Sequence, residues 1–273
     1  MIKDWQKFEK DSFEYIKNNF SNENLTLKLL GDSDSSKSDI YVKTPNSEFF
    51  IEIKSPISQG GQFVLSKNNQ KKWIFGEGNK TKNTINSSKI IDDLNSESNF
   101  NITTASTNLT TDSETLSNWL IDFYSQKNVR YIITKFNSEY VILPLNKIST
   151  YFNIIASVRK KGSGSSDVSN PFWNKIKNFE IFKNVTESKV IGKKRYLYFK
   201  ALPNQFNENS KIVFSDFIND DFIRLQLEVV DTSSNKVYIR KLSTTSNPTV
   251  IFTLESKTQQ QIDDLNDFKQ SLI

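Results

Sequence analysis

The stretch that decides the fold is residues 31–65, GDSDSSKSDIYVKTPNSEFFIEIKSPISQGGQFVL. Two runs rich in β-branched and aromatic residues, 39–42 and 49–54, lie on either side of a Thr-Pro-Asn-Ser turn. This pattern is typical of a β-hairpin, because such side chains favour strands and the Pro-Asn pair favours a turn between them. The predicted hairpin would bring the carboxylate of Asp39 beside that of Glu52.

Glu52 and Lys54 are two positions apart in the second predicted strand, so both side chains should project from one face of the sheet. Asp39, Glu52 and the backbone carbonyl of Ile53 would supply the hard oxygen ligands that Mg²⁺ prefers. Lys54 would orient or deprotonate an attacking water and offset negative charge on a phosphate. The alternative is an ordinary hairpin with a solvated ion pair of little energetic value, although this pair interrupts an apolar strand and buried charges need compensation.

The pattern Ser38-Asp39-x12-Glu52-x-Lys54 resembles the motif of the PD-(D/E)xK nuclease superfamily, the fold of most type II restriction endonucleases. The resemblance implies an α/β (α+β) fold with a restriction-endonuclease-like mixed β-sheet core flanked by helices, and Mg²⁺-dependent cleavage of DNA phosphodiesters. By motif position it identifies Asp39 and Glu52 as metal ligands and Lys54 as the catalytic lysine. Ser38 stands where the superfamily's name has proline.

Residues 4–20 predict an amphipathic helix that follows a capping residue, Asp4. Glu9 falls within its apolar stripe, whereas Glu14 lies on the lysine-rich side. A carboxylate on the buried side needs a partner, and the superfamily's first helix often presents a glutamate towards the metal site. We therefore expect Glu9 to be an accessory acid. The alternative is that Glu9 borders the stripe and reaches water.

The composition narrows the chemistry. The chain has 273 residues, 36% of them hydrophobic, which is typical of a globular protein. It contains neither His nor Cys, which excludes a Ser-His-Asp triad, an HNH-type nuclease and a zinc-thiolate site. Asp, Glu and Lys must therefore carry any catalysis. The N-terminus is polar and no apolar run reaches about 18 residues, so we expect no signal peptide, no membrane span and a cytoplasmic location.

The basic residues are unevenly distributed. Residues 151–200 hold eleven Lys and Arg and three acidic residues, which suits a DNA cleft beside a carboxylate site but also a solvated lysine-rich surface. Within this region Arg-Lys-Lys-Gly-Ser-Gly-Ser-Ser reads as a phosphate-binding loop, or alternatively as a flexible linker. A second loop after Lys54 would carry two glutamines towards phosphates or base edges, or alternatively would be a plain connection. The expected DNA-binding residues are Gln59, Gln62, Arg159, Lys160, Lys161, Ser163, Ser165 and Ser166.

Two other acidic residues, Asp32 and Asp34, compete with Asp39 for the metal. They lie in a polar turn with no apolar run behind them, and we rank them lower. Along the chain, residues 1–155 are expected to form the nuclease core and residues 156–273 a β-rich DNA-binding and recognition region. Residues 76–112 are expected to form an extended loop or insertion.

The sequence thus predicts a type II restriction endonuclease that hydrolyses double-stranded DNA at a specific sequence. A homodimer is expected if the site is palindromic, and the resemblance implies a cognate DNA methyltransferase. One alternative is another nuclease of the superfamily, active in repair, recombination or phage defence. Another is a non-catalytic DNA-binding protein in which the Glu-x-Lys pair is incidental.

Overall fold

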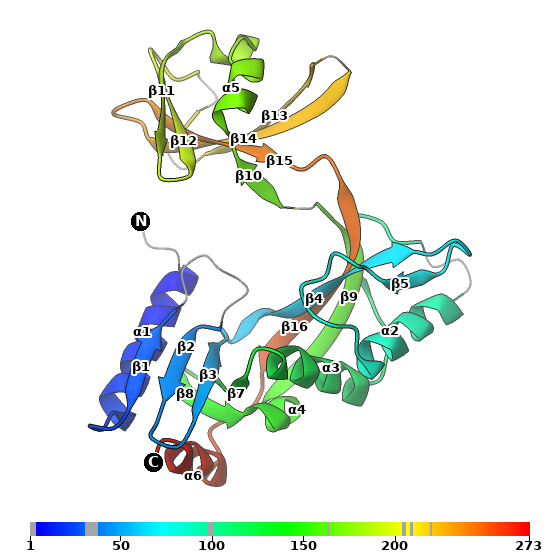
Figure 1. Ribbon diagram of the computed structural model, residues 1–273, viewed down its shortest axis with the longest axis vertical. Coiled ribbons are helices and arrows are strands. Elements are labelled where there is room, and N and C mark those ends of the chain that lie inside the picture. The colour runs from blue at the N-terminus through cyan, green and yellow to red at the C-terminus, as the bar shows by residue number, and fades with distance from the viewer. Residues whose placement is uncertain are drawn as a thin grey trace. The chain divides into compact units, whose positions relative to one another are not determined.

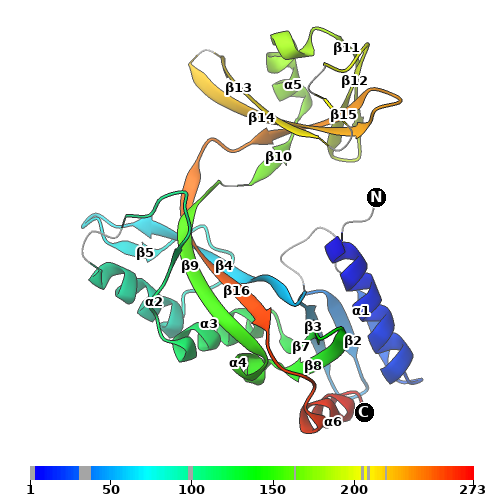
Figure 2. The same ribbon diagram turned by 180° about the vertical axis from the view of Figure 1, so that it is seen from behind.

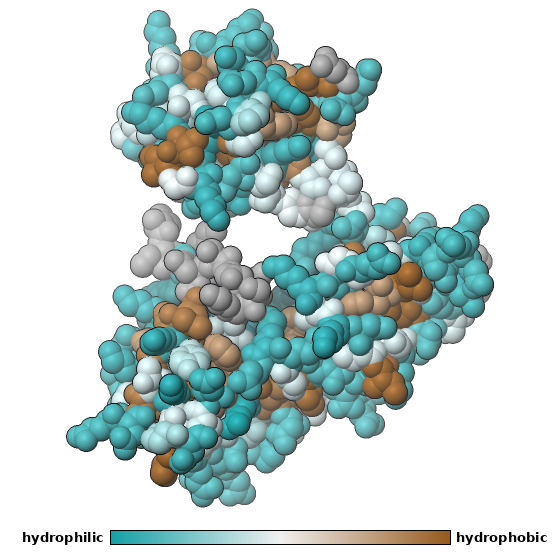
Figure 3. All heavy atoms as spheres, viewed as in Figure 1, coloured by the Kyte–Doolittle hydropathy of each residue, from teal (hydrophilic) through white to brown (hydrophobic). Residues whose placement is uncertain are grey.

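Figure 1 shows the chain as a computed structural model that describes residues 4–30, 38–97, 101–162, 164–203, 206–207, 210–218 and 220–273. It mixes helices and strands and divides into two compact units. Unit 1 comprises Met1–Lys160 and Pro248–Ile273, and unit 2 comprises Lys161–Asn247. Within the described residues, no helix is long and apolar enough to cross a membrane. Figure 3 shows hydrophobic residues on the visible face as separate groups among hydrophilic ones.

The first sheet of unit 1 contains the predicted hairpin. In this sheet one pair of neighbouring strands, Glu48–Ile53 and Val129–Phe136, is parallel, and the other neighbouring pairs are antiparallel. Two helices, α1 (Asp4–Phe20) and α6 (Ile262–Ser271), contribute to the apolar cluster on one face of this sheet. In spatial order the strands are β1 (Thr26–Leu29), β2 (Ile40–Lys43), β3 (Glu48–Ile53), β7 (Val129–Phe136) and β8 (Glu139–Pro144).

The second sheet of unit 1 packs against α2 (Ile85–Ser96) and α3 (Ser113–Ser125). Trp119 of α3 stacks on Phe252, with 4.0 Å between the ring centroids, so this helix is fixed by segments far apart in sequence. A 3-10 turn, η1 (Leu145–Lys147), leads into the short helix α4 (Ile148–Tyr151). In spatial order the strands are β5 (Trp73–Phe75), β4 (Ile57–Lys67), β16 (Ser246–Ser256), β9 (Phe152–Gly162) and β6 (Thr107–Asn108).

A buried carboxylate anchors the C-terminal helix α6. Asp264 accepts hydrogen bonds from the Lys147 ammonium and the Tyr151 hydroxyl, both at 2.5 Å. Because Asp264 is only 2% exposed, these partners compensate a charge that would otherwise be costly to bury. The C-terminal segment is therefore an ordered part of unit 1.

Unit 2 is an antiparallel sheet with one covered face (Figure 2). The helix α5 (Asn170–Ile176) and the 3-10 turn η2 (Glu180–Phe182) supply side chains to the apolar cluster on that face. The spatial order of the strands is β11 (Val185–Ile191), β12 (Lys194–Phe199), β15 (Lys236–Leu242), β14 (Asp221–Asp231) and β13 (Lys211–Ile218), and β10 (Ser165–Asp167) also pairs with β15.

The fold agrees with the predicted class, and several local predictions need correction. The N-terminal helix and the hairpin form as predicted. The predicted loop at 76–112 contains the helix α2, and the predicted Gly-Gly loop is part of the strand β4. The predicted region 156–273 is not one block, because β16 pairs with β4 and returns residues 248–273 to unit 1.

The close approach of β4 to α3 gives a test of this packing. A Cβ atom on Gly61 would lie 2.9 Å from the Trp119 ring, whereas one on Gly78 would meet no heavy atom within 4 Å. Gly61→Ala should lower the free energy of unfolding by about 1–3 kcal/mol through overpacking. Gly78→Ala should change it by less than about 0.5 kcal/mol. Urea unfolding followed by circular dichroism measures both, and equal effects would contradict the packing.

Candidate active site

The β2–β3 hairpin places the predicted site at the end of the first sheet. Ile40 pairs with Ile51, so Asp39, one residue before β2, lies opposite Glu52. The turn between the strands is closed by a hydrogen bond of 2.8 Å from the Thr44 amide to the Ser47 carbonyl. The local sequence therefore fixes the register, and the register determines which carboxylates meet.

Asp39 is held by the backbone of the neighbouring strand. Its Oδ2 accepts a hydrogen bond of 2.7 Å from the Ile53 amide. Burial and the negative charge of Glu52 raise the pKa of Asp39 to about 7, although the Lys54 ammonium and the Ile53 amide oppose this rise. The carboxyl thus sits where its negative charge is incompletely compensated, which is typical of a site built for a cation.

Glu52 and Lys54 form an ion pair of 2.7 Å between Oε1 and Nζ, with side chains 9% and 15% exposed. Burial is the largest single effect and disfavours the ammonium form of Lys54, but the charges of Glu52, Tyr124 and Asp39 together outweigh it, so the net effect raises the pKa of Lys54. The lysine follows β3 directly, and its amide donates to the Ile133 carbonyl of β7 at 2.9 Å. Strand pairing therefore holds the backbone that carries both side chains.

Tyr124 of α3 is a residue that the sequence analysis missed. Its ring centroid lies 5.8 Å from Lys54 Nζ, and its buried hydroxyl donates a hydrogen bond to the Gly60 carbonyl of β4. Burial raises the pKa of Tyr124. A buried tyrosine hydroxyl needs a hydrogen-bond partner. The place of Tyr124 on the apolar stripe of α3 could therefore have indicated a tertiary hydrogen bond, but the sequence does not identify the Gly60 carbonyl as the acceptor.

Lys127, just beyond α3, is a second basic residue beside this cluster. Its Nζ lies 4.4 Å from the ring centroid of Phe123, the residue next to Tyr124 in the sequence. Burial lowers the pKa of Lys127, and the charges of Glu52 and Asp39 oppose that shift. The site therefore has a positive charge on its helix side in addition to Lys54.

Glu9 lies on α1, whose apolar side chains join the cluster on the Ile51 and Ile53 face of the sheet. Glu52 and Lys54 project from the opposite face. The charge of Glu9 contributes to the raised pKa of Asp39, but it is the smallest of the causes. The structure thus brings Asp39, Glu52 and Lys54 together, and Glu9 affects this cluster only weakly.

The donor set suits a small divalent cation. Glu52 Oε2 and Ser38 Oγ are buried and have no hydrogen-bond partner among the described residues. Glu52 can therefore offer Oε2 to a cation while Oε1 keeps its contact with Lys54. Within the same residues no group of three or more acidic side chains could hold a metal, so Asp39 and Glu52 would act with backbone and water oxygens. Asp32 and Asp34 lie outside the described residues.

The two glutamines expected to contact DNA lie on β4. The pairing of β4 with β16 shifts register between Gly61 and Gln59, so Gly60 is the extra residue of a β-bulge. The bulge brings Gln59 and Gln62 onto one face, where Gln59 Nε2 donates to Gln62 Oε1 at 3.0 Å. The two amides thus form a pair on a strand and are not part of the loop that the sequence predicted.

The expected phosphate-binding loop is largely strand. Arg159, Lys160 and Lys161 belong to β9, where successive side chains alternate, so Lys160 points away from its two neighbours. Ser165 and Ser166 belong to β10, and Ser163 lies outside the described residues. The three cations therefore do not converge on one point as a loop would allow.

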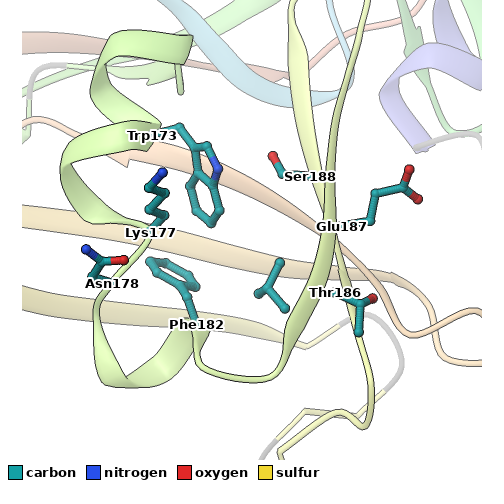
Figure 4. A pocket seen from close by; sticks show the side chains of 8 residues that line it. Trp173, Lys177, Asn178, Phe182, Thr186, Glu187 and Ser188 are labelled. Atoms are coloured by element: carbon teal, nitrogen blue, oxygen red, sulfur yellow. The ribbon is translucent and has the colours of Figure 1, made fainter.

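A shallow depression of about 260 Å³ lies in unit 2, between α5 and β11 (Figure 4). The rings of Trp173 and Phe182 line it, and Glu187 points away from Trp173. It lacks the paired carboxylates found at the end of β2 and β3. We therefore place the candidate active site at Asp39, Glu52 and Lys54.

The fold of the chain is similar to that of a restriction endonuclease. The solved structure that carries this conclusion is that of HhaI endonuclease in complex with DNA, with a TM-score of 0.76 and 25% sequence identity. The match covers 98% of this chain and 97% of that chain, so it includes both units. No protein-family model and no curated protein matches the sequence.

The raised pKa of Asp39 makes a prediction for stability. A carboxyl whose pKa is higher in the folded chain contributes stability that is complete below the unfolded value and lost as pH rises through about 7. In EDTA, Asp39→Asn should therefore raise Tm, and by more at about pH 8 than at about pH 5. Thermal melts measure the difference. Asp92→Asn, on the exposed side of α2, is the matched control, and an equal change of Tm in both variants at both pH values would contradict the prediction.

Proposed function

We propose that the chain is a Mg²⁺-dependent type II restriction endonuclease of the PD-(D/E)xK superfamily, acting on double-stranded DNA. The single observation that carries the proposal is the cluster of Asp39, Glu52 and Lys54 at the end of one hairpin, in a fold that matches HhaI endonuclease over 98% of this chain. DNA is the proposed substrate because that neighbour was solved in complex with DNA.

Asp39 and Glu52 would hold the Mg²⁺ ion through their carboxylates, and the Ile53 carbonyl is the proposed third protein ligand. The ion would polarise the scissile phosphodiester and make a bound water more acidic. Asp39 is already oriented by the Ile53 amide, and Glu52 has one oxygen free of hydrogen bonds among the described residues. Little rearrangement of the two side chains is therefore needed for binding.

Lys54 would donate hydrogen bonds and positive charge to the reacting phosphate. Its pKa is raised by Glu52, which favours the ammonium form and hence charge stabilisation over proton abstraction. Water oxygen would bond to phosphorus as the bond to the 3′ oxygen breaks, leaving a 5′-phosphate and a 3′-hydroxyl. Glu9 would act through the charge that it adds near Asp39.

The remaining parts of the proposal concern recognition and assembly. Gln59 and Gln62, paired on β4, are suited to base edges because an amide offers a donor and an acceptor side by side. Arg159 is the proposed phosphate contact on the exposed end of β9. A palindromic target would pair with a homodimer, and a DNA methyltransferase would protect the host sequence.

Cleavage of unmethylated phage DNA tests the function. The purified chain should give discrete fragments with Mg²⁺ and none with EDTA. Lys54→Ala should lower the cleavage rate by about 10²-fold or more while DNA binding persists, because it removes charge needed in the transition state. Lys89→Ala, which removes an exposed lysine of α2, should cleave at the wild-type rate.

The pattern of products separates the rival functions. A smear of products that depends on Mg²⁺ and on Lys54 would indicate a structure-directed nuclease and contradict sequence-specific cleavage. DNA that is bound but stays intact with every substrate would contradict the nuclease function and indicate a non-catalytic DNA-binding protein.

A further inference from the structure

The sheet of unit 2 has a second face that the proposed active site does not use. Because side chains alternate along a strand, Arg195, Leu197 and Phe199 of β12 point to one face, and Tyr196 and Tyr198 to the other. The first set belongs to the covered side, where Leu197 and Phe199 join the apolar cluster with α5. The second face has no apolar cluster among the described residues.

Register places aromatic and basic side chains together on this second face. Tyr196 pairs with Tyr238, and Tyr198 pairs with Lys236 across β12 and β15. The next strand adds Gln226 and Glu228, which pair with Arg240 and Tyr238. We call the central group the tyrosine–cation face: Lys194, Tyr196, Tyr198, Lys236, Tyr238 and Arg240.

Each ring of this face lies close to a cation. Lys236 Nζ is 4.5 Å from the centroid of the Tyr196 ring, and Lys194 Nζ is 5.5 Å from that of Tyr238. The Arg240 guanidinium is 4.9 Å from the Tyr238 ring. Such contacts let the stems of long side chains cover aromatic surface while their charged ends remain in water. The cations are therefore partly ordered before any ligand binds.

The charges of this surface are only partly compensated. Arg240 pairs with Glu228 at 3.1 Å, and the Tyr238 hydroxyl donates to Asp167 at 2.6 Å. Lys194 and Lys236, in contrast, have no carboxylate within ion-pair distance in the described part of the chain. A row of ordered cations with spare charge is complementary to a polyanion with regularly spaced phosphates.

We propose that the tyrosine–cation face of unit 2 binds the sugar–phosphate backbone of duplex DNA, with Lys194 and Lys236 as the main phosphate contacts. This inference rests on the proposed function for its ligand, and it assigns a second DNA-contacting surface apart from the active site. The tyrosine rings are already covered by cations, so this face suits phosphates better than stacked bases. Tyr196 acts as the positioning residue for Lys236, and Tyr238 as the positioning residue for Lys194.

Binding of a fluorescein-labelled duplex of mixed sequence, measured by anisotropy in EDTA, tests the proposal with the full chain. Lys194→Ala combined with Lys236→Ala should weaken binding by on the order of tenfold and reduce the slope of log K against log salt by about 2. The control removes the same charge from α5 and its C-cap on the covered side, through Lys175→Ala with Lys177→Ala. It should leave the slope within about 0.5 of wild type. Circular dichroism checks that both variants fold.

The outcomes distinguish this inference from the proposed function. Equal losses in the two double variants, or no loss in either, would overturn the assigned surface even if the wild-type chain cleaves DNA. A selective loss in Lys194→Ala with Lys236→Ala would support the surface even if no cleavage occurs, in which case only the nuclease proposal fails. A wild-type chain that does not bind the duplex in EDTA would also overturn the assigned surface, whereas the nuclease proposal is decided by cleavage with Mg²⁺.

Discussion

Two carboxylates and one ammonium share the end of the β2–β3 hairpin, and this electrostatic arrangement is the constraint on which the site depends. Asp39 and Glu52 repel each other in a partly desolvated place, and the 2.7 Å contact between Glu52 and Lys54 offsets only part of that repulsion. Such a cluster costs stability in the absence of a cation, so the surrounding fold must hold it in place.

The support comes from three directions. The Ile53 amide orients Asp39, the parallel pairing of β3 with β7 fixes the backbone at Lys54, and α3 closes the lysine side through Tyr124. The position of α3 depends in turn on Trp119, which packs against Gly61 of β4 and stacks on Phe252 of β16. Residues far apart in sequence thus determine the geometry around a local motif.

Sequence predicted the parts that local interactions determine. Strand alternation, a Pro-Asn turn and an amphipathic helix are short-range signals, and they identified the hairpin, α1 and the cluster of Asp39, Glu52 and Lys54. The strand β4 was missed because a Gly-Gly pair is typical of a loop, whereas here Gly61 is required by close packing against Trp119 of α3 and Gly60 by close packing against Leu254 of β16. The contact of Tyr124 with Gly60 and the pairing of β16 with β4 join residues far apart in sequence. The periodicity of side chains within one segment does not predict such contacts.

The central claim is that Asp39 and Glu52 bind one divalent cation together. A crystal structure of the chain soaked in Mn²⁺, with anomalous diffraction data, measures this directly, because Mn²⁺ binds the same oxygen ligands as Mg²⁺ and gives an anomalous signal. We predict a peak in contact with carboxylate oxygens of both Asp39 and Glu52. A peak that contacts neither residue, or no peak at the end of the hairpin, would contradict the account.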